Sequence, residues 1–65
     1  MTLEEHIYLI LLTQGPCTLE QLYEVIDIDQ GNVFISVDVL MRKGITIWVD
    51  DPEGRLGNIF IGLNQ

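Results

Sequence analysis

Two apolar stripes with helical spacing, joined by a turn-rich segment, constrain the fold of this sequence more than any other feature. The first stripe consists of Leu19, Leu22, Val25 and Ile26. The second consists of Val33, Phe34, Val37, Leu40 and Met41. Residues 27–32 (DIDQGN) are turn formers around Ile28, which is expected to plug the turn. The pattern predicts two packed helices, one capped by Thr18 and one running from residue 29 or 30 to Lys43.

A further helix is predicted ahead of this pair, from Thr2 to Gln14. Thr2 and Glu5 have the spacing of a capping box, and Gly15 followed by Pro16 ends the helix. The face expected to join the core carries Leu3, Ile7, Ile10 and Leu11. A second apolar stripe consists of Tyr8, Leu9 and Leu12. Because an amphipathic helix needs only one stripe, the second is expected either to join two copies of the chain or to pack against the C-terminal strands.

The pattern changes from helical to alternating after Lys43. Gly44 stands where a left-handed residue commonly ends a helix. Residues 45–49 alternate in the manner of a strand, residues 50–55 (DDPEGR) form a turn, and residues 58–63 (NIFIGL) form a second strand. The sequence therefore predicts an α+β fold of three helices followed by a two-stranded β-hairpin, in one domain over residues 1–65.

This order of elements resembles the winged helix-turn-helix family. The segment from Thr18 to Ile45 (TLEQLYEVIDIDQGNVFISVDVLMRKGI) has the family's spacing, with Leu22 and Val25 facing the core and a K-G-I step leading into the hairpin, or wing. The small size is similar to the compact coregulators of fimbrial operons (the PapI/FaeA type), and small phage and plasmid regulators share the layout. The resemblance implies a bacterial or phage transcription regulator that binds double-stranded DNA with its third helix in the major groove.

The charge balance argues against tight binding to nucleic acid. The chain has ten acidic and three basic residues, a net charge of −7, whereas each DNA phosphate that is neutralised needs a cation. The single cysteine, Cys17, excludes an internal disulfide, and no Cys/His cluster has metal-ligand spacing, so no cofactor is expected. The longest apolar run, residues 7–12, is too short to span a bilayer. A cytoplasmic protein is expected.

The outward face of the third helix is the predicted binding site. Candidate contacts to DNA or to a protein partner are Gln30, Asn32, Ile35, Ser36, Val39, Arg42 and Lys43, with Arg55 in the wing. With DNA, Asn32 would pair with adenine, and Arg42 and Lys43 would contact phosphates. With a protein, Ile35 and Val39 would form an apolar ridge within a polar rim. A third interpretation is that both apolar side chains only pack within the domain.

The wing sequence differs from one that contacts DNA. Its turn carries Arg55 alone against Asp50, Asp51 and Glu53, which predicts a solvated turn that repels phosphate. Trp48 lies on the first predicted strand, on the opposite face from Ile47 and Val49. Trp48 is expected either to anchor an interface, as a candidate for self-association beside Tyr8, Leu9 and Leu12, or to cover the end of the core.

No residue has the surroundings of a catalytic group. His6 has no nucleophile near it in sequence, and Cys17 is interpreted as a half-buried apolar residue, although a helix N-terminus could lower its pKa. The chain is therefore expected to be a regulator, not an enzyme, in which protein contacts matter at least as much as DNA contacts. A homodimer through the first helix is an additional hypothesis. The alternative is an acidic protein-binding module or inhibitor that mimics DNA charge and has lost DNA binding.

Overall fold

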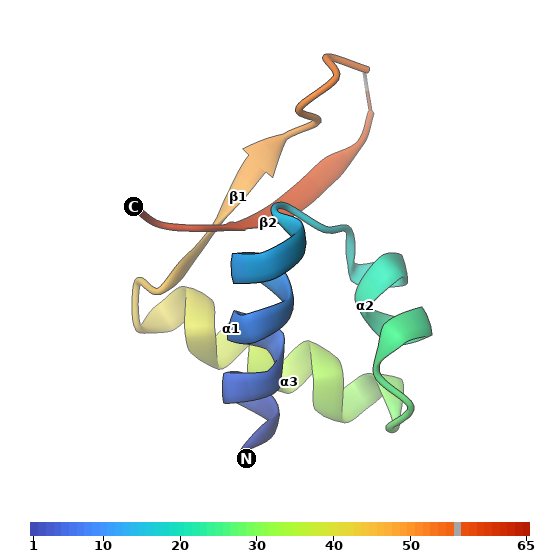
Figure 1. The fold of residues 1–65 in the computed structure, drawn as a ribbon, viewed down its shortest axis with the longest axis vertical. Helices are drawn as coiled ribbons and strands as arrows, with labels where there is room; N and C mark the ends of the chain where they lie inside the picture. The colour runs from blue at the N-terminus through green and yellow to red at the C-terminus, as the bar shows by residue number, and fades with distance from the viewer. Residues whose placement is uncertain (56) are drawn as a thin grey trace.

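The computed structural model describes residues 1–55 and 57–65 and contains the predicted order of three helices and a hairpin. The elements are α1 Leu3–Gln14, α2 Leu19–Val25, α3 Gln30–Arg42, β1 Thr46–Asp50 and β2 Ile59–Leu63. In Figure 1, α3 crosses behind α1, α2 stands beside them, and the hairpin extends over the C-terminal end of α1. This arrangement leaves one long side of α3 facing away from α1.

Capping residues fix where α1 and α2 begin, as the sequence indicates. Thr2 Oγ1 accepts the Glu5 backbone N–H at 3.2 Å, and the Glu5 carboxylate accepts the Thr2 backbone N–H at 3.0 Å. The Glu5 carboxylate also accepts a hydrogen bond from the Thr2 hydroxyl. The bond from the Thr2 backbone, and after it the bond from the hydroxyl, lowers the pKa of Glu5. Thr18 and Gln21 make the same reciprocal pair at 3.1 and 2.9 Å. Both helices thus begin at a threonine whose side chain satisfies a free backbone donor.

Gly44 ends α3 and turns the chain into β1. Its φ of 76° is in the left-handed region, as predicted for this position. The Ile45 N–H donates to the Leu40 carbonyl at 3.0 Å, and the Gly44 N–H donates to the Met41 carbonyl at 3.0 Å. These are the two bonds of a Schellman motif. The direction of β1, and therefore the position of the wing, depends on this glycine.

The two strands of the hairpin pair along their whole length, and Cys17, in the loop between α1 and α2, forms a single β-bridge to β2. In the antiparallel register, Thr46 lies opposite Leu63, and Trp48 lies opposite Ile61. On the other edge of β2, Ile61 and Cys17 exchange backbone hydrogen bonds of 2.7 and 3.0 Å. Facing residues of a pair share one side of a sheet, so Thr46, Trp48 and Ile61 point the same way. This side carries the buried residues Thr46 and Ile61.

The core lies where α1, α2, α3 and β2 meet. Its buried residues are Ile7, Ile10, Leu11, Cys17, Leu22, Ile26, Val33, Val37, Leu40 and Ile61. Leu3, Leu19 and Met41 pack against them as partly buried residues, in agreement with their predicted apolar stripes. Helical spacing alone identified most of this core.

Val25 and Ile28 were wrongly predicted to face the core, since each is 50% exposed. The face of α2 that packs is centred on Leu22 and on Ile26, which follows the helix as its C-cap. On a helix of 100° per residue, Val25 and Tyr23 lie at opposite margins of this face, and it is Tyr23 that packs against the core. The Ile28 N–H donates to the Ile26 carbonyl at 2.9 Å, and this tight turn leaves Ile26, not Ile28, as the plug.

Thr46 carries a buried hydroxyl without a hydrogen-bond partner among the described residues. The side chain is 1% exposed and lies on the core side of the hairpin. Replacing Thr46 with valine keeps the branched shape and removes the unpaired group. We expect Thr46→Val to raise the free energy of unfolding by about 1 kcal/mol, measured by urea denaturation. A decrease in stability would mean that the hydroxyl has a partner when the protein is in water.

Candidate partner-binding surface on α3 and the wing

The outward side of α3 carries two large exposed apolar side chains. Ile35 is 61% exposed and Phe34 is 52% exposed. Asn32, Asp38 and Arg42 lie around them on the same helix, and Asp38 is joined to Arg42 one turn later. We call these five residues the α3 face. A pair of exposed apolar residues beside a charged pair differs from the row of polar side chains that usually meets base edges.

The packing rotates α3 relative to the orientation expected from its sequence. Phe34 was predicted to lie on the core side and is exposed, whereas Ser36 was predicted to point outward and is buried at 7% exposure. Val39, predicted at the centre of the outward side, is half-buried. The buried residues Val33, Val37 and Leu40 then centre the core face closer to Ser36 than to Phe34. Ser36 is thereby removed from the candidate contacts, and Phe34 is added to them.

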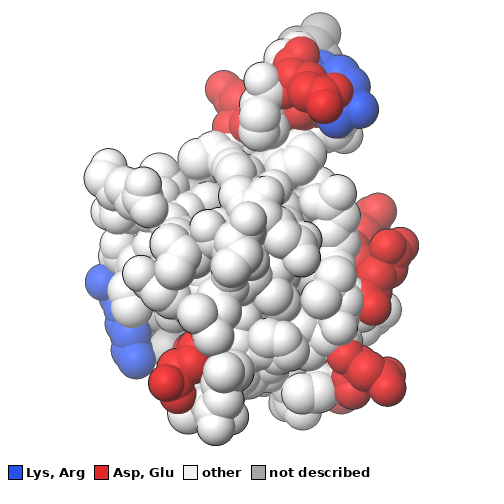
Figure 2. All heavy atoms as spheres, viewed as in Figure 1, with Lys and Arg blue, Asp and Glu red and all other residues white. Residues whose placement is uncertain are grey.

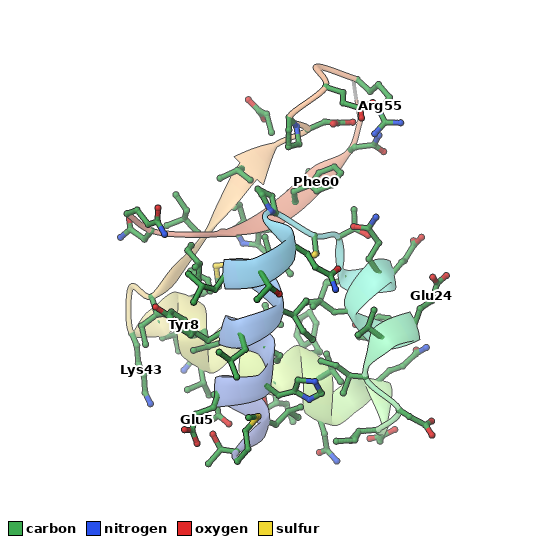
Figure 3. The ribbon with its side chains drawn as sticks, in the orientation of Figure 1. Glu5, Tyr8, Glu24, Lys43, Arg55 and Phe60 are labelled. Atoms are coloured by element: carbon green, nitrogen blue, oxygen red, sulfur yellow. The ribbon has the colours of Figure 1, made fainter. Side chains whose placement is uncertain are left out.

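The basic residues of the chain do not form one positive strip. Arg42 Nε lies 3.0 Å from an Asp38 carboxylate oxygen, so this guanidinium is already paired on the helix surface. Figure 3 places Arg55 at the far end of the hairpin and Lys43 near Tyr8, on another part of the molecule. A phosphate backbone following α3 and the wing would therefore meet scattered cations, and the two arginines among them are paired with acids.

Asp51 organises the turn at the end of the wing. Its carboxylate accepts hydrogen bonds from Arg55 Nε at 2.7 Å, Asn58 Nδ2 at 3.0 Å and the Glu53 backbone N–H at 2.8 Å. The bond from Arg55, with those from Asn58 and Glu53, lowers the pKa of Asp51 to about 2, and the same contact raises the pKa of Arg55. The prediction of a merely solvated turn was therefore wrong for Asp51, which is buried.

These contacts predict a specific pH dependence for the wing. An unfolded aspartate has a pKa near 3.9, whereas Asp51 in the fold has a pKa of about 2. A lowered pKa contributes stability that is fully present above the unfolded value and is lost as the pH falls through the folded value. We therefore expect the Asp51 carboxyl, followed by NMR, to titrate near pH 2. The wing should loosen between pH 4 and 2, and a midpoint close to 4 would contradict these contacts.

The second apolar stripe of α1 is partly exposed. Tyr8, Leu9 and Leu12 all remain accessible. Figure 2 shows that the centre of this side of the molecule is free of charged side chains, which gather around its rim. Trp48 is not part of this surface: Tyr8 and Leu9 line a groove with Lys43, whereas Trp48 lines another groove beside α2. The four candidates for self-association therefore do not form one patch.

Cys17 is placed for packing and not for reaction. It is buried, its Sγ lies 3.3 Å from the Gly15 carbonyl oxygen, and burial raises the pKa of its thiol. A raised pKa keeps the thiol protonated, which is opposite to a helix-activated nucleophile. Within residues 1–55 and 57–65, no group of three or more His, Cys, Asp or Glu side chains could hold a metal ion. None of the described helices is long and apolar enough to cross a membrane.

Comparison with known proteins supports the architecture. No family model matches the sequence, and no curated protein matches it. Among solved structures, a MarR-like transcriptional regulator from Thermotoga maritima superposes with a TM-score of 0.82 at 25% sequence identity. The match covers 97% of this chain and 44% of the regulator, so the chain spans less than half of that protein's length. The fold is a winged helix-turn-helix.

In the winged-helix fold, α3 is the second helix of the helix-turn-helix motif. The structural match supports a regulator-like fold but not the PapI/FaeA or phage subtype expected from the sequence. In DNA-binding helix-turn-helix domains, the residues near the start of the second helix of the motif contact base edges. Here, Phe34 and Ile35 occupy the first two turns of α3. Sequence reasoning missed Phe34, although placing Ser36 in the core would have turned Phe34 outward.

Proposed function

We propose that this chain acts in transcription regulation through protein contacts made by the α3 face. The observation that carries the proposal is the exposure of the apolar side chains of Ile35 and Phe34, 61% and 52%, on the helix that DNA-binding helix-turn-helix proteins place in the major groove. Large apolar side chains in water favour burial against another protein, and aromatic residues are enriched in the centres of such interfaces. Asp38 and Arg42 would form part of the polar rim.

Charge supports the same proposal. The net charge of −7 repels a polyanion, and Arg42 and Arg55 already contact Asp38 and Asp51 at 3.0 and 2.7 Å. To contact phosphates, each arginine would have to leave its carboxylate or bring that negative charge close to the DNA. A protein surface with apolar and mixed charged groups has no such conflict.

Direct DNA binding is the second candidate, and one observation favours it. The structure resembles a protein described as a transcriptional regulator over 97% of this chain. Under this hypothesis, Gln30 and Asn32 at the beginning of α3 would contact base edges, and Lys43 at its end would contact a phosphate. The alternative to a transcription regulator is an acidic protein-binding module or inhibitor that mimics DNA charge, which the net charge of −7 supports.

Charge-matched variants test the α3 face. We propose to immobilise the protein, capture partners from a lysate of its source cells, and compare Ile35→Glu with Ile47→Glu. Both positions are exposed, so each variant adds one charge to the surface, on α3 in one case and on the hairpin in the other. Loss of a captured protein with Ile35→Glu alone is expected, by about tenfold or more for a central interface residue. Equal capture by both variants and the unaltered protein would reject the α3 face as the contact.

A further inference from the structure

A second apolar groove lies between the hairpin and the beginning of α2. It has a volume of about 600 Å³, and its described lining residues are Thr18, Leu19, Glu20, Trp48, Gly57, Asn58 and Ile59. Trp48 and Ile59, 52% and 62% exposed, are the large apolar side chains among its described lining residues on the hairpin. None of the lining residues belongs to α3 or α1. This groove is therefore separate from the α3 face.

The edge of β2 beside this groove is only partly paired. Ile61 uses its backbone N–H and C=O to bind Cys17 at 2.7 and 3.0 Å. Backbone groups alternate along a strand, so those of Ile59 point to the same edge. The chain cannot continue this pairing, because Thr18 caps α2 directly after Cys17. The edge at Ile59 can thus accept one more extended segment, which is how many peptides bind to sheets.

The charges around the groove favour a basic segment. Glu20 is the charged residue among its lining side chains, and Asp50 lies opposite Ile59 on the paired strand. Arg55 is the arginine closest in sequence to the hairpin residues of the groove. Its guanidinium is already paired with Asp51 at 2.7 Å and Glu53 at 3.4 Å. An apolar floor with carboxylates beside it is complementary to a strand that presents apolar and cationic side chains on the same face.

We propose that this groove binds an extended protein segment by strand addition to β2, and that the face of the segment turned to the groove carries both apolar and basic side chains. The backbone of the segment pairs with the edge at Ile59. Its apolar side chains cover Trp48 and Ile59, and its basic side chains lie beside Glu20. The proposal is independent of the α3 face, since neither surface contains a residue of the other.

Trp48 is the only tryptophan of the chain, so its fluorescence reports on this groove directly. The probe is a synthetic six-residue peptide with threonine at every second position and valine, lysine and valine at the other three, so that these three share one face of the strand. The control peptide has glutamate in place of the lysine. The lysine peptide is expected to shift the emission of Trp48 to shorter wavelength in a saturable titration, because it covers an exposed indole ring. The glutamate peptide is expected to leave the emission unchanged.

Two pairs of variants separate groove binding from general attraction to an acidic protein. Ile59→Lys should lower the affinity for the lysine peptide by about tenfold or more. Ile47→Lys adds the same charge on the opposite side of the hairpin and should change this affinity by no more than about twofold. Glu20→Gln should weaken binding more than Glu24→Gln, which removes the same charge one turn further along α2. Glu24, labelled on α2 in Figure 3, is not among the described residues that line the groove.

Several results would overturn the proposal. Equal binding of both peptides would show that the charge of the groove is irrelevant. Equal loss in Ile59→Lys and Ile47→Lys would show that only net charge matters. A Trp48 emission that changes with protein concentration alone would mean that a second copy of the chain occupies the groove. No emission change for the lysine peptide at millimolar concentration would exclude strand addition there.

Discussion

Leu22→Ala should lower the free energy of unfolding by about 2–5 kcal/mol. Leu22 is fully buried within the core, on the short helix α2. The substitution removes apolar contacts and leaves a cavity that the three helices and the hairpin cannot easily close. A chain of this size has a total stability of only roughly 3–5 kcal/mol. A large fraction of the variant should therefore be unfolded, which circular dichroism during urea titration would measure.

Val25→Ala on the same helix is the matched control. Val25 is 50% exposed, so its truncation should change the stability by no more than about 0.5 kcal/mol. The two variants together test the orientation of α2, because the apolar spacing in the sequence predicted that both residues are buried. If Val25→Ala were as damaging as Leu22→Ala, α2 would be rotated relative to the orientation described above.

Ile61→Ala should have a comparably large effect on the hairpin, about 2–5 kcal/mol. Ile61 is fully buried, lies opposite Trp48 in the sheet, and holds the Cys17 loop through two backbone hydrogen bonds. Its side chain belongs to the buried core cluster that the three helices form with the hairpin. Losing it should both destabilise the domain and loosen the wing, and hydrogen exchange at the Cys17 amide would detect the second effect.

Ile59→Ala provides the comparison on the same strand and the same side of the sheet. Ile59 is 62% exposed, two residues before Ile61. Its truncation should leave both the unfolding free energy and the exchange of the Cys17 amide nearly unchanged. Protection of the Cys17 amide that survived in Ile61→Ala would contradict the role of Ile61 in joining wing and core.

Features specified by neighbouring residues could be predicted from the sequence. Thr2 and Thr18 begin their helices, and Gly44 takes the left-handed conformation expected of it. The two threonines act through hydrogen bonds to residues three positions later, and Gly44 acts through the tolerance of glycine for a positive φ. The change from helical to alternating spacing after Lys43 likewise identified the hairpin. These local signals were sufficient for the order of elements.

Features set by packing between elements could not be predicted as well. The spacing of apolar residues shows that a helix has an apolar side. That side is several residues wide, so the spacing does not determine which of them point directly into the core. Phe34, at one margin of the α3 stripe, is exposed, and Ser36, beyond the other margin, is buried. The apolar content of the outward side was expected from Ile35, but its aromatic member was assigned to the core.

The wing shows a second limit. Asp51 was counted with Asp50 and Glu53 as part of an acidic turn, because all three have the same charge in the sequence. The structure distinguishes them: Asp51 receives Arg55 and Asn58, four and seven positions later. Which acid receives these donors depends on the path of the turn. Arg55, a candidate contact of the wing in the sequence analysis, is consequently paired with Asp51 and Glu53 of the same turn.

Titration of a fluorescently labelled DNA duplex of mixed sequence tests most directly whether α3 contacts protein instead of DNA. Anisotropy would be measured at about 20 mM salt, where charge-driven association is strongest, and again at about 200 mM. If the α3 face binds protein instead of DNA, the duplex should show no saturable binding at either salt concentration. This should hold up to a protein concentration of roughly 10⁻⁴ M, where DNA-binding domains still bind DNA non-specifically. Tight binding that weakens steeply with added salt would contradict this account and would restore α3 and the wing as a DNA-binding surface.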